Sequence, residues 1–190
     1  MIILGIDPGS LTTGWALLKI HGNKIHYLSS GVLKFNKETP FLERLTEIKI
    51  KAGRLMREVK PDEVAFESLI FVKSPTALIK LAQTRGVLLS EMVEKYDGRI
   101  FEYSPNLIKS TAVGHGHADK ESVKKFLDMV LGKREYSTHD ESDAVAIALC
   151  HALNRKTHLS AASTNSKSTK KRIPKSKGGG LASALAHKIG

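Results

Sequence analysis

The sequence predicts an α/β protein with a five-stranded mixed sheet flanked by helices. Short apolar runs of strand length occur along the chain, and turn signals close the first run and separate the second from the third. Segments with helical spacing of apolar residues follow the third run and separate the later ones. Three strands in succession, followed by alternating helices and strands, favour an antiparallel meander that is extended by α/β crossovers.

Each strand is marked by its apolar run and by its ends. The run Ile-Ile-Leu-Gly-Ile before Asp7 is typical of a buried strand, and Pro8-Gly9 ends it. A turn signal, His-Gly-Asn at residues 21–23, joins the second and third strands. The predicted strands cover residues 2–7, 12–20, 24–35, 63–67 and 100–103.

Helices are marked by periodicity and by their first residues. Apolar residues between Leu42 and Val59 recur every three or four positions, which is helical spacing. Ser74-Pro75 and Ser104-Pro105 each place a capping serine before a proline at the first helical position. The predicted helices cover residues 41–59, 74–96, 104 to the Gly-His-Gly-His loop at 114–117, 120–131 and 140–153.

Composition divides the chain into a globular part, residues 1–155, and a basic tail, residues 156–190. The tail is rich in Ser, Thr, Lys and Gly, and we expect it to be disordered. The net charge is +11, yet residues 1–154 carry 21 basic and 19 acidic residues, so the end of the chain holds most of the excess. A basic tail indicates binding to nucleic acid, and the alternative is a solubilising tail without a fixed partner.

The compartment is suggested by what the sequence lacks. Cys150 is the only cysteine, which excludes an intrachain disulfide and favours a reduced cytoplasmic location. No stretch approaches the roughly 18 to 20 apolar residues that a membrane span needs. The first residues lack the basic region of a signal peptide. We therefore expect a cytoplasmic protein without a membrane partner.

Four carboxylates carry the chemistry that the sequence suggests. Asp7 and Glu67 each end an apolar strand, where parallel-type sheets place their ligand sites. Asp140 and Asp143 are three residues apart and so share one face of a helix. Oxygen ligands suit Mg²⁺ or Mn²⁺ rather than Zn²⁺, and two such ions promote phosphodiester hydrolysis. Taken alone, Asp140 is equally well explained as an acid favoured by the helix dipole.

Four segments of the chain, in order, resemble the RuvC family of Holliday-junction endonucleases. Residues 5–10 (Gly-Ile-Asp-Pro-Gly-Ser), followed by Thr13-Gly14, are similar to the opening of the family, and Phe66-Glu67 is similar to its second acidic strand. Residues 80–86 (Lys-Leu-Ala-Gln-Thr-Arg-Gly) resemble a helix signature, and residues 140–148 resemble the closing motif. The resemblance covers residues 1 to about 154, so it implies that the globular part is a nuclease domain with a ribonuclease-H-like fold.

The resemblance implies a metal-dependent endonuclease that resolves four-way (Holliday) DNA junctions by symmetric paired nicks and leaves 5′-phosphate ends. It implies that the metal ligands are Asp7, Glu67, Asp140 and Asp143, with two Mg²⁺ ions per site and Mn²⁺ as a substitute. Lys109 and Lys120 match basic residues near the scissile phosphate, and Lys120 also lies at a helix start, which favours phosphate. The alternative for each lysine is a solvated surface charge.

Two symmetric nicks require two active sites, so the resemblance implies a homodimer. The helix from Thr76 to Tyr96 is a candidate dimer surface, through Leu78, Leu81, Val87 and Leu88. The resemblance also implies a partnership with the RuvA–RuvB branch-migration complex.

Further DNA contacts are expected near the second acid. Many relatives carry an aromatic residue three positions after it, which wedges into the junction; here that position is Ile70, and Phe71 follows. Either side chain is a candidate wedge that unstacks a base step, and the alternative is that both belong partly to the core. Lys73 and Arg85 are the other residues expected to bind DNA.

Three histidines and two rival functions are the remaining alternatives to this interpretation. His139 precedes Asp140 and is expected to be an exposed neighbour rather than a ligand, and His115 and His117 lack the third histidine or the cysteine of a zinc site. An actin-like ATPase also opens with Gly-Ile-Asp-x-Gly-Ser, but it needs a far longer chain and a second phosphate loop. A non-catalytic nucleic-acid-binding protein on the same fold would not require the intact set of four acids.

Overall fold

The computed structural model of the chain describes residues 1–69, 74–113 and 120–165, and for Val113, Lys120 and residues 156–165 it describes the backbone only. The chain forms two units, Met1–Arg155 and Lys156–Gly190. The fold below is that of the first unit. The predicted disorder of the tail is wrong for residues 156–165, whose backbone continues helix α5. From residue 166 onward the tail lies outside the described part of the chain, so its disorder and the division into nuclease domain and tail stay predictions.

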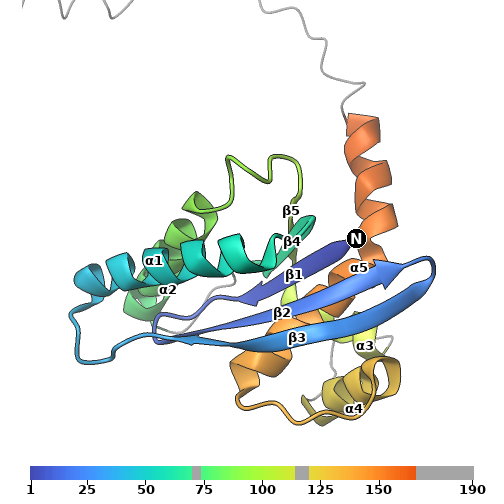
Figure 1. Ribbon diagram of the computed structural model, residues 1–190, viewed down its shortest axis with the longest axis horizontal. Helices are drawn as coiled ribbons and strands as arrows, with labels where there is room; N and C mark the ends of the chain where they lie inside the picture. Colours follow the sequence, from blue (N-terminus) through green and yellow to red (C-terminus); the bar gives the residue numbers. More distant parts are fainter. Residues whose placement is uncertain (70–73, 114–119, 166–190) are drawn as a thin grey trace, which may run out of the picture. The chain divides into compact units, whose positions relative to one another are not determined.

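A five-stranded sheet with the order β3-β2-β1-β4-β5 forms the centre of the first unit (Figure 1). The strands are β1 (Ile2–Asp7), β2 (Thr12–His21), β3 (Lys24–Lys34), β4 (Glu63–Glu67) and β5 (Ile100–Tyr103). The β1–β2 and β2–β3 pairs are antiparallel, whereas β4 is parallel to both β1 and β5. The predicted α/β fold with a five-stranded mixed sheet is confirmed.

The helices are α1 (Phe41–Val59), α2 (Pro75–Ser90), α3 (Pro105–Val113), α4 (Lys120–Leu131) and α5 (His139–Asn165). Two of them differ from the prediction at their ends. Helix α2 stops at Ser90 instead of Tyr96, because the chain tightens there: the Met92 amide donates to the Leu89 carbonyl at 2.8 Å, and Met92 and Tyr96 turn into the core. Helix α5 continues past Leu153, where no glycine or proline stops it.

The helices cover the two faces of the sheet in different ways (Figure 1). On one face, α1 and α2 pack over Leu4, Ile6, Val64 and Phe66. On the other, α5 packs over Ile3 and Ala65, with α3 and α4 beside it. Successive strand residues point to opposite faces, so the acid at residue 7 shares the α5 face with residues 3 and 5. None of the helices in the described part of the chain is long and apolar enough to cross a membrane.

Small residues let α5 lie unusually close to the sheet. A Cβ atom on Gly5 would lie 2.3 Å from the Ala144 carbonyl oxygen and 2.8 Å from the Ala148 Cβ. A Cβ on Gly14 would lie 1.8 Å from the Asp140 carbonyl oxygen. Real Cβ contacts are essentially never shorter than 3.0 Å, so only glycine permits either approach. The start of α5, which carries Asp140 and Asp143, therefore rests directly on β1 and β2.

Candidate active site

Asp7 ends β1 beside the first turn of α5. It pairs in register with Gly14 of β2, and directly opposite residues of an antiparallel pair point to the same face of the sheet. The missing side chain of Gly14 leaves the space that the backbone of Asp140 occupies. The structure thus brings the strand end that carries Asp7 next to the helix start that carries Asp140. The sequence predicts that these two acids meet, but it does not show the contact.

Glu67 ends β4, the strand next to β1. The register pairs Ile6 with Phe66, so Glu67 follows at the level of Asp7 on the neighbouring strand. Phe66 faces the α1 side, which turns Glu67 towards α5. The two acidic strand ends are therefore adjacent on the sheet and point to the same side.

The electrostatics connect Glu67 with α5 and α3. Burial raises the pKa of the Glu67 carboxyl, the negative charge of Asp143 raises it further, and Lys109 on α3 acts in the opposite direction. Two acids and one lysine thus lie within electrostatic reach of one another. A cation placed between Glu67 and Asp143 would relieve their repulsion.

A pocket of about 760 Å³ contains these groups. Its wall includes Glu67 from β4, Lys109 from α3, Lys124 from α4, and His139 and Asp143 from α5. Separate segments of the sequence therefore contribute to one concave site, as is typical of ligand sites at the carboxyl ends of parallel strands. Two of the four expected metal ligands, Glu67 and Asp143, and one of the expected phosphate-binding lysines, Lys109, line this pocket.

The donor chemistry of the four acids fits a hard divalent cation, because all of their ligating atoms are carboxylate oxygens. Within residues 1–69, 74–113 and 120–165, however, no group of three or more Asp, Glu, His or Cys side chains is placed so that it could hold a metal ion. Neighbouring carboxylates repel one another when no cation lies between them. Metal ligation by all four acids stays a prediction.

Arg85, one of the residues expected to bind DNA, is buried in the protein and is 5% exposed. Its Nη1 donates to the backbone carbonyl of Glu67 at 2.5 Å, its Nη2 pairs with Glu102, and its guanidinium lies 5.2 Å from the centre of the Phe66 ring. Arg85 therefore holds the end of β4 in place, and with it the backbone from which the Glu67 side chain extends. A contact of Arg85 with DNA stays a prediction.

Several expected site residues lie outside the described part of the chain. These are Ile70, Phe71 and Lys73 after the second acid, and His115 and His117 in the loop before α4. For Lys120 the structure describes only the backbone, which begins α4 as predicted. His139 is exposed, as expected, and lines the pocket.

Two residues near the site were missed by the sequence analysis. Lys124 lines the pocket from α4. It follows Lys120 by four positions, and this spacing places both on one helix face, so the signal was present in the sequence. Glu141 is buried next to Asp140, and only the tertiary structure reveals its partners.

A mixed sheet of this order, with acids at the ends of the adjacent strands β1 and β4 and a helix that brings further acids to them, defines a ribonuclease-H-like protein. A comparison with family models places the chain more closely: it belongs to the family of crossover junction endodeoxyribonucleases RuvC, whose model matches residues 3–151. The predicted family and ribonuclease-H-like fold are thereby confirmed.

Individual relatives agree with this assignment. The chain is 41% identical over 157 residues to a crossover junction endodeoxyribonuclease RuvC of Methylobacterium radiotolerans, covering 82% of this chain and 75% of that protein. It is 35% identical to the RuvC of Brucella suis, covering 84% of this chain and 91% of that protein. Among solved structures, T. thermophilus RuvC in complex with a Holliday junction substrate matches with a TM-score of 0.75 and 30% identity, covering 83% of this chain and 96% of that one.

Proposed function

We propose that this protein is a metal-dependent endonuclease that resolves four-way DNA junctions by paired nicks during recombination and repair. Its family is that of the crossover junction endodeoxyribonucleases, and a solved relative is bound to a Holliday junction. The observation that carries the proposal is the pocket in which Glu67, Asp143 and Lys109 meet. Acids that attract cations, next to a lysine that attracts phosphate, suit the cleavage of a phosphodiester.

The four acids Asp7, Glu67, Asp140 and Asp143 would hold two Mg²⁺ ions, for which Mn²⁺ would substitute. When bound, such ions activate a water molecule and neutralise the charge that develops on the leaving oxygen. Lys109 and Lys120 would bind the phosphate. Glu67 must lose its proton before it can ligate a cation. Because the pKa of Glu67 is raised, Glu67 becomes protonated earlier than an ordinary glutamate as the pH falls. The site should therefore begin to lose its affinity for metal at a higher pH than a site with an ordinary glutamate would.

Symmetric cleavage of a four-way junction needs two active sites, and a homodimer with twofold symmetry provides them. Of the residues predicted for this contact, Leu88 is 1% exposed and belongs to the core, so its prediction is wrong, whereas Leu78, Leu81 and Val87 are partly exposed. Ile79 is 57% exposed and Val93, just after α2, is 49% exposed. We therefore propose that the dimer contact includes Ile79 and Val93 together with Leu78, Leu81 and Val87. Partnership with RuvA–RuvB and a cytoplasmic location are part of the same proposal.

The decisive experiment uses the variant Asp7→Asn on a synthetic four-way junction. The variant should bind the junction with nearly the wild-type affinity, because binding depends on phosphate contacts, and should not cleave it in the presence of Mg²⁺. A mobility-shift assay and a cleavage assay on the same preparation measure both properties. Cleavage by Asp7→Asn near the wild-type rate would show that Asp7 is not a ligand.

The wild-type protein in the same assays separates the rival functions. An actin-like ATPase would hydrolyse ATP without cutting DNA. A non-catalytic nucleic-acid-binding protein would bind the junction and leave it intact with every divalent cation. Only a junction endonuclease gives paired nicks that depend on Mg²⁺ or Mn²⁺.

A further inference from the structure

The first turn of α5 contains an acid that faces away from the pocket. Glu141 lies between Asp140 and Asp143 in the sequence, but one residue along a helix is a turn of about 100°, so its side chain leaves on another side. Glu141 is 7% exposed, whereas no residue beside it in the first turn is equally buried. A buried carboxylate needs strong partners.

One carboxylate oxygen of Glu141 is used close to the helix start. Its Oε2 accepts hydrogen bonds from the backbone amide and from the hydroxyl of Ser137, both at 2.7 Å. In return, the Glu141 amide donates to Oγ1 of Thr138 at 3.2 Å. This is close to a capping box, in which the first and fourth residues of a helix start satisfy one another. By itself it would mean only that the helix begins firmly.

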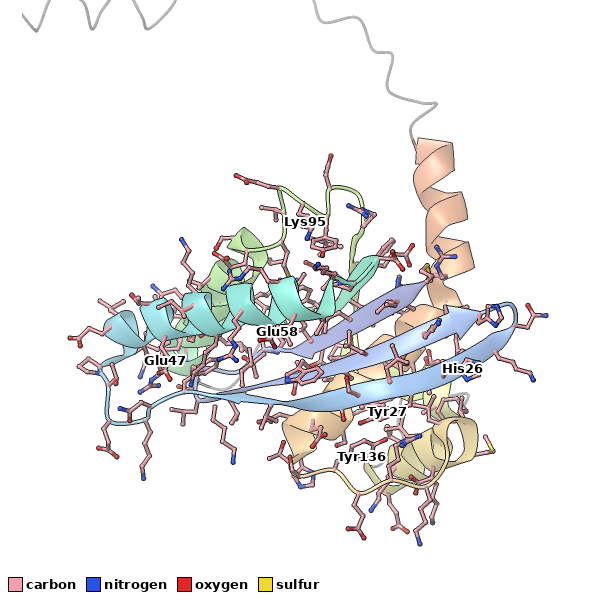
Figure 2. The ribbon with its side chains drawn as sticks, viewed as in Figure 1. His26, Tyr27, Glu47, Glu58, Lys95 and Tyr136 are labelled. Atoms are coloured by element: carbon pink, nitrogen blue, oxygen red, sulfur yellow. The ribbon has the colours of Figure 1, made fainter. Side chains whose placement is uncertain are left out.

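The other oxygen of Glu141 reaches a distant strand. Its Oε1 accepts a hydrogen bond from the hydroxyl of Ser30 on β3 at 2.6 Å. The hydroxyl of Ser30 also lies 2.8 Å from that of Tyr27. Figure 2 shows Tyr27 on β3 and Tyr136 in the segment that leads into α5, both on the side of the sheet where α4 lies. A capping box does not need this second connection, which joins residues 111 positions apart.

The two supports of the helix start act on neighbouring strands. Ser30 pairs in register with Ala16 of β2, two residues from Gly14, on which the backbone of Asp140 rests. The Gly14 contact sets how closely α5 approaches the sheet. The Ser30 hydrogen bond opposes sliding or rotation of the first turn, because a hydrogen bond weakens steeply when its angle departs from linearity.

We propose that Glu141 is a positioning residue for junction cleavage: it ties the first turn of α5 to Ser30 of β3 and thereby holds Asp140 and Asp143 at the ends of β1 and β4. The proposal rests on the proposed function of the pocket. A displacement of about 1 Å of groups that align a reaction can lower its rate about 100-fold. The side chain does not line the pocket, so it acts through the acids and not on the DNA.

The test compares Glu141→Ala, Glu141→Gln and Ser30→Ala with the wild-type protein on one junction substrate. For Glu141→Ala we expect kcat to fall about 10- to 100-fold while the Kd for the junction changes less than about twofold. Ser30→Ala removes the tie to β3 and keeps the Ser137 bonds, so its kcat should also fall without a matching change in Kd. Glu141→Gln can still accept from Ser30 and should lose less activity than Glu141→Ala.

Two control variants separate positioning from general stability. Glu135→Ala removes an exposed acid from the segment before α5 and should leave kcat unchanged. Ile48→Val weakens the core on the opposite face of the sheet, where Ile48 is fully buried. It lowers the melting temperature without touching α5, and at an assay temperature well below melting it should retain its kcat.

Each outcome decides the proposal. A wild-type kcat in Glu141→Ala, or a loss no larger than that of Ile48→Val at an equal loss of melting temperature, would overturn it. A junction Kd that rises in step with the loss of cleavage would also overturn it, because Glu141 would then act in binding. If the wild-type protein itself does not cut junctions, the proposed function fails. That failure is distinguishable from a failure of the positioning role, because it is seen without any substitution.

Discussion

The tight contact between Gly14 of β2 and the start of α5 gives the sharpest prediction, the substitution Gly14→Ala. The new Cβ would lie 1.8 Å from the carbonyl oxygen of Asp140, 2.4 Å from its carbonyl carbon and 3.1 Å from the amide nitrogen of Glu141. All three are backbone atoms, so no side-chain rotation can relieve the contact. Ordinary contact begins at 3.4 Å, so the start of α5 must move by about 1.6 Å.

The size of the effect follows from this displacement. Forcing an extra carbon into a well-packed contact costs about 1–3 kcal/mol of unfolding free energy. For a chain of this size, that lowers the melting temperature by about 2–12 °C. The move also carries Asp140 away from Asp7, and a displacement of this size costs about 100-fold in cleavage rate. Junction binding should remain near the wild-type affinity.

The assay for Gly14→Ala is thermal unfolding together with single-turnover cleavage of a four-way junction. Gly86→Ala is the matched control, because a Cβ on that α2 glycine meets no atom within 4 Å. Alanine is preferred to glycine inside a helix, so in thermal unfolding this control should be stabilised by about 0.5–1 kcal/mol. If Gly14→Ala melts and cleaves like the wild-type protein, the close packing of α5 on β2 is not what holds the acid in place.

Three further predictions concern the core, the tail and the loop after the second acid. Burial acts to raise the pKa of Glu63, but hydrogen bonds, led by those from Arg155, outweigh it and lower the pKa. The ionised Glu63 therefore stabilises the fold above its ordinary pKa of 4.5, and this stabilisation is lost as the pH falls below that value. Glu63→Gln should lose about 3–5 kcal/mol of unfolding free energy at neutral pH. Its melting temperature should then fall less steeply towards acid pH than that of the wild-type protein, which thermal unfolding at several pH values would measure. Truncation after Asn165 removes seven basic residues. The log–log slope of junction affinity against salt concentration should become shallower by about 0.9 for each phosphate that the tail neutralises, and the cleavage position should not move. An unchanged slope would mean that the tail does not touch DNA. Phe71→Ala should weaken unstacking at the junction centre by about 1–3 kcal/mol, more than Ile70→Ala does, as a fluorescent base analogue would report; a large loss of melting temperature with an intact base signal would instead assign Phe71 to the core.

The acids at the strand ends could be predicted because their signals are local. Asp7 follows an apolar run and precedes a proline and a glycine, and Glu67 ends a second apolar run, so each strand end is visible in a few consecutive residues. The helices α1 and α4 begin and end where their periodicity and turn signals place them. The same kind of evidence predicted five strands and their order along the chain.

Features that depend on long-range packing could not be predicted in this way. The sequence predicts Arg85 to be a DNA-binding residue, yet it is buried against the end of β4. Its partners, Glu67 and Glu102, come from the strands β4 and β5, which the local sequence pattern of α2 does not reveal. The end of α2 at Ser90 is set by the burial of Met92 and Tyr96, which local propensity does not contain. Helix propensity is a weak influence compared with tertiary packing.

The sequence by itself determined the family, the mixed α/β sheet and the identity of the four acids, because these depend on apolar periodicity, turn residues and short motifs within single segments. Only the tertiary structure decided which residues share the pocket, why Gly14 is needed under Asp140 and where Glu141 directs its carboxylate. The physical reason is that hydrogen bonds and steric contacts form between atoms that the fold brings together, in this case between residues 111 positions apart.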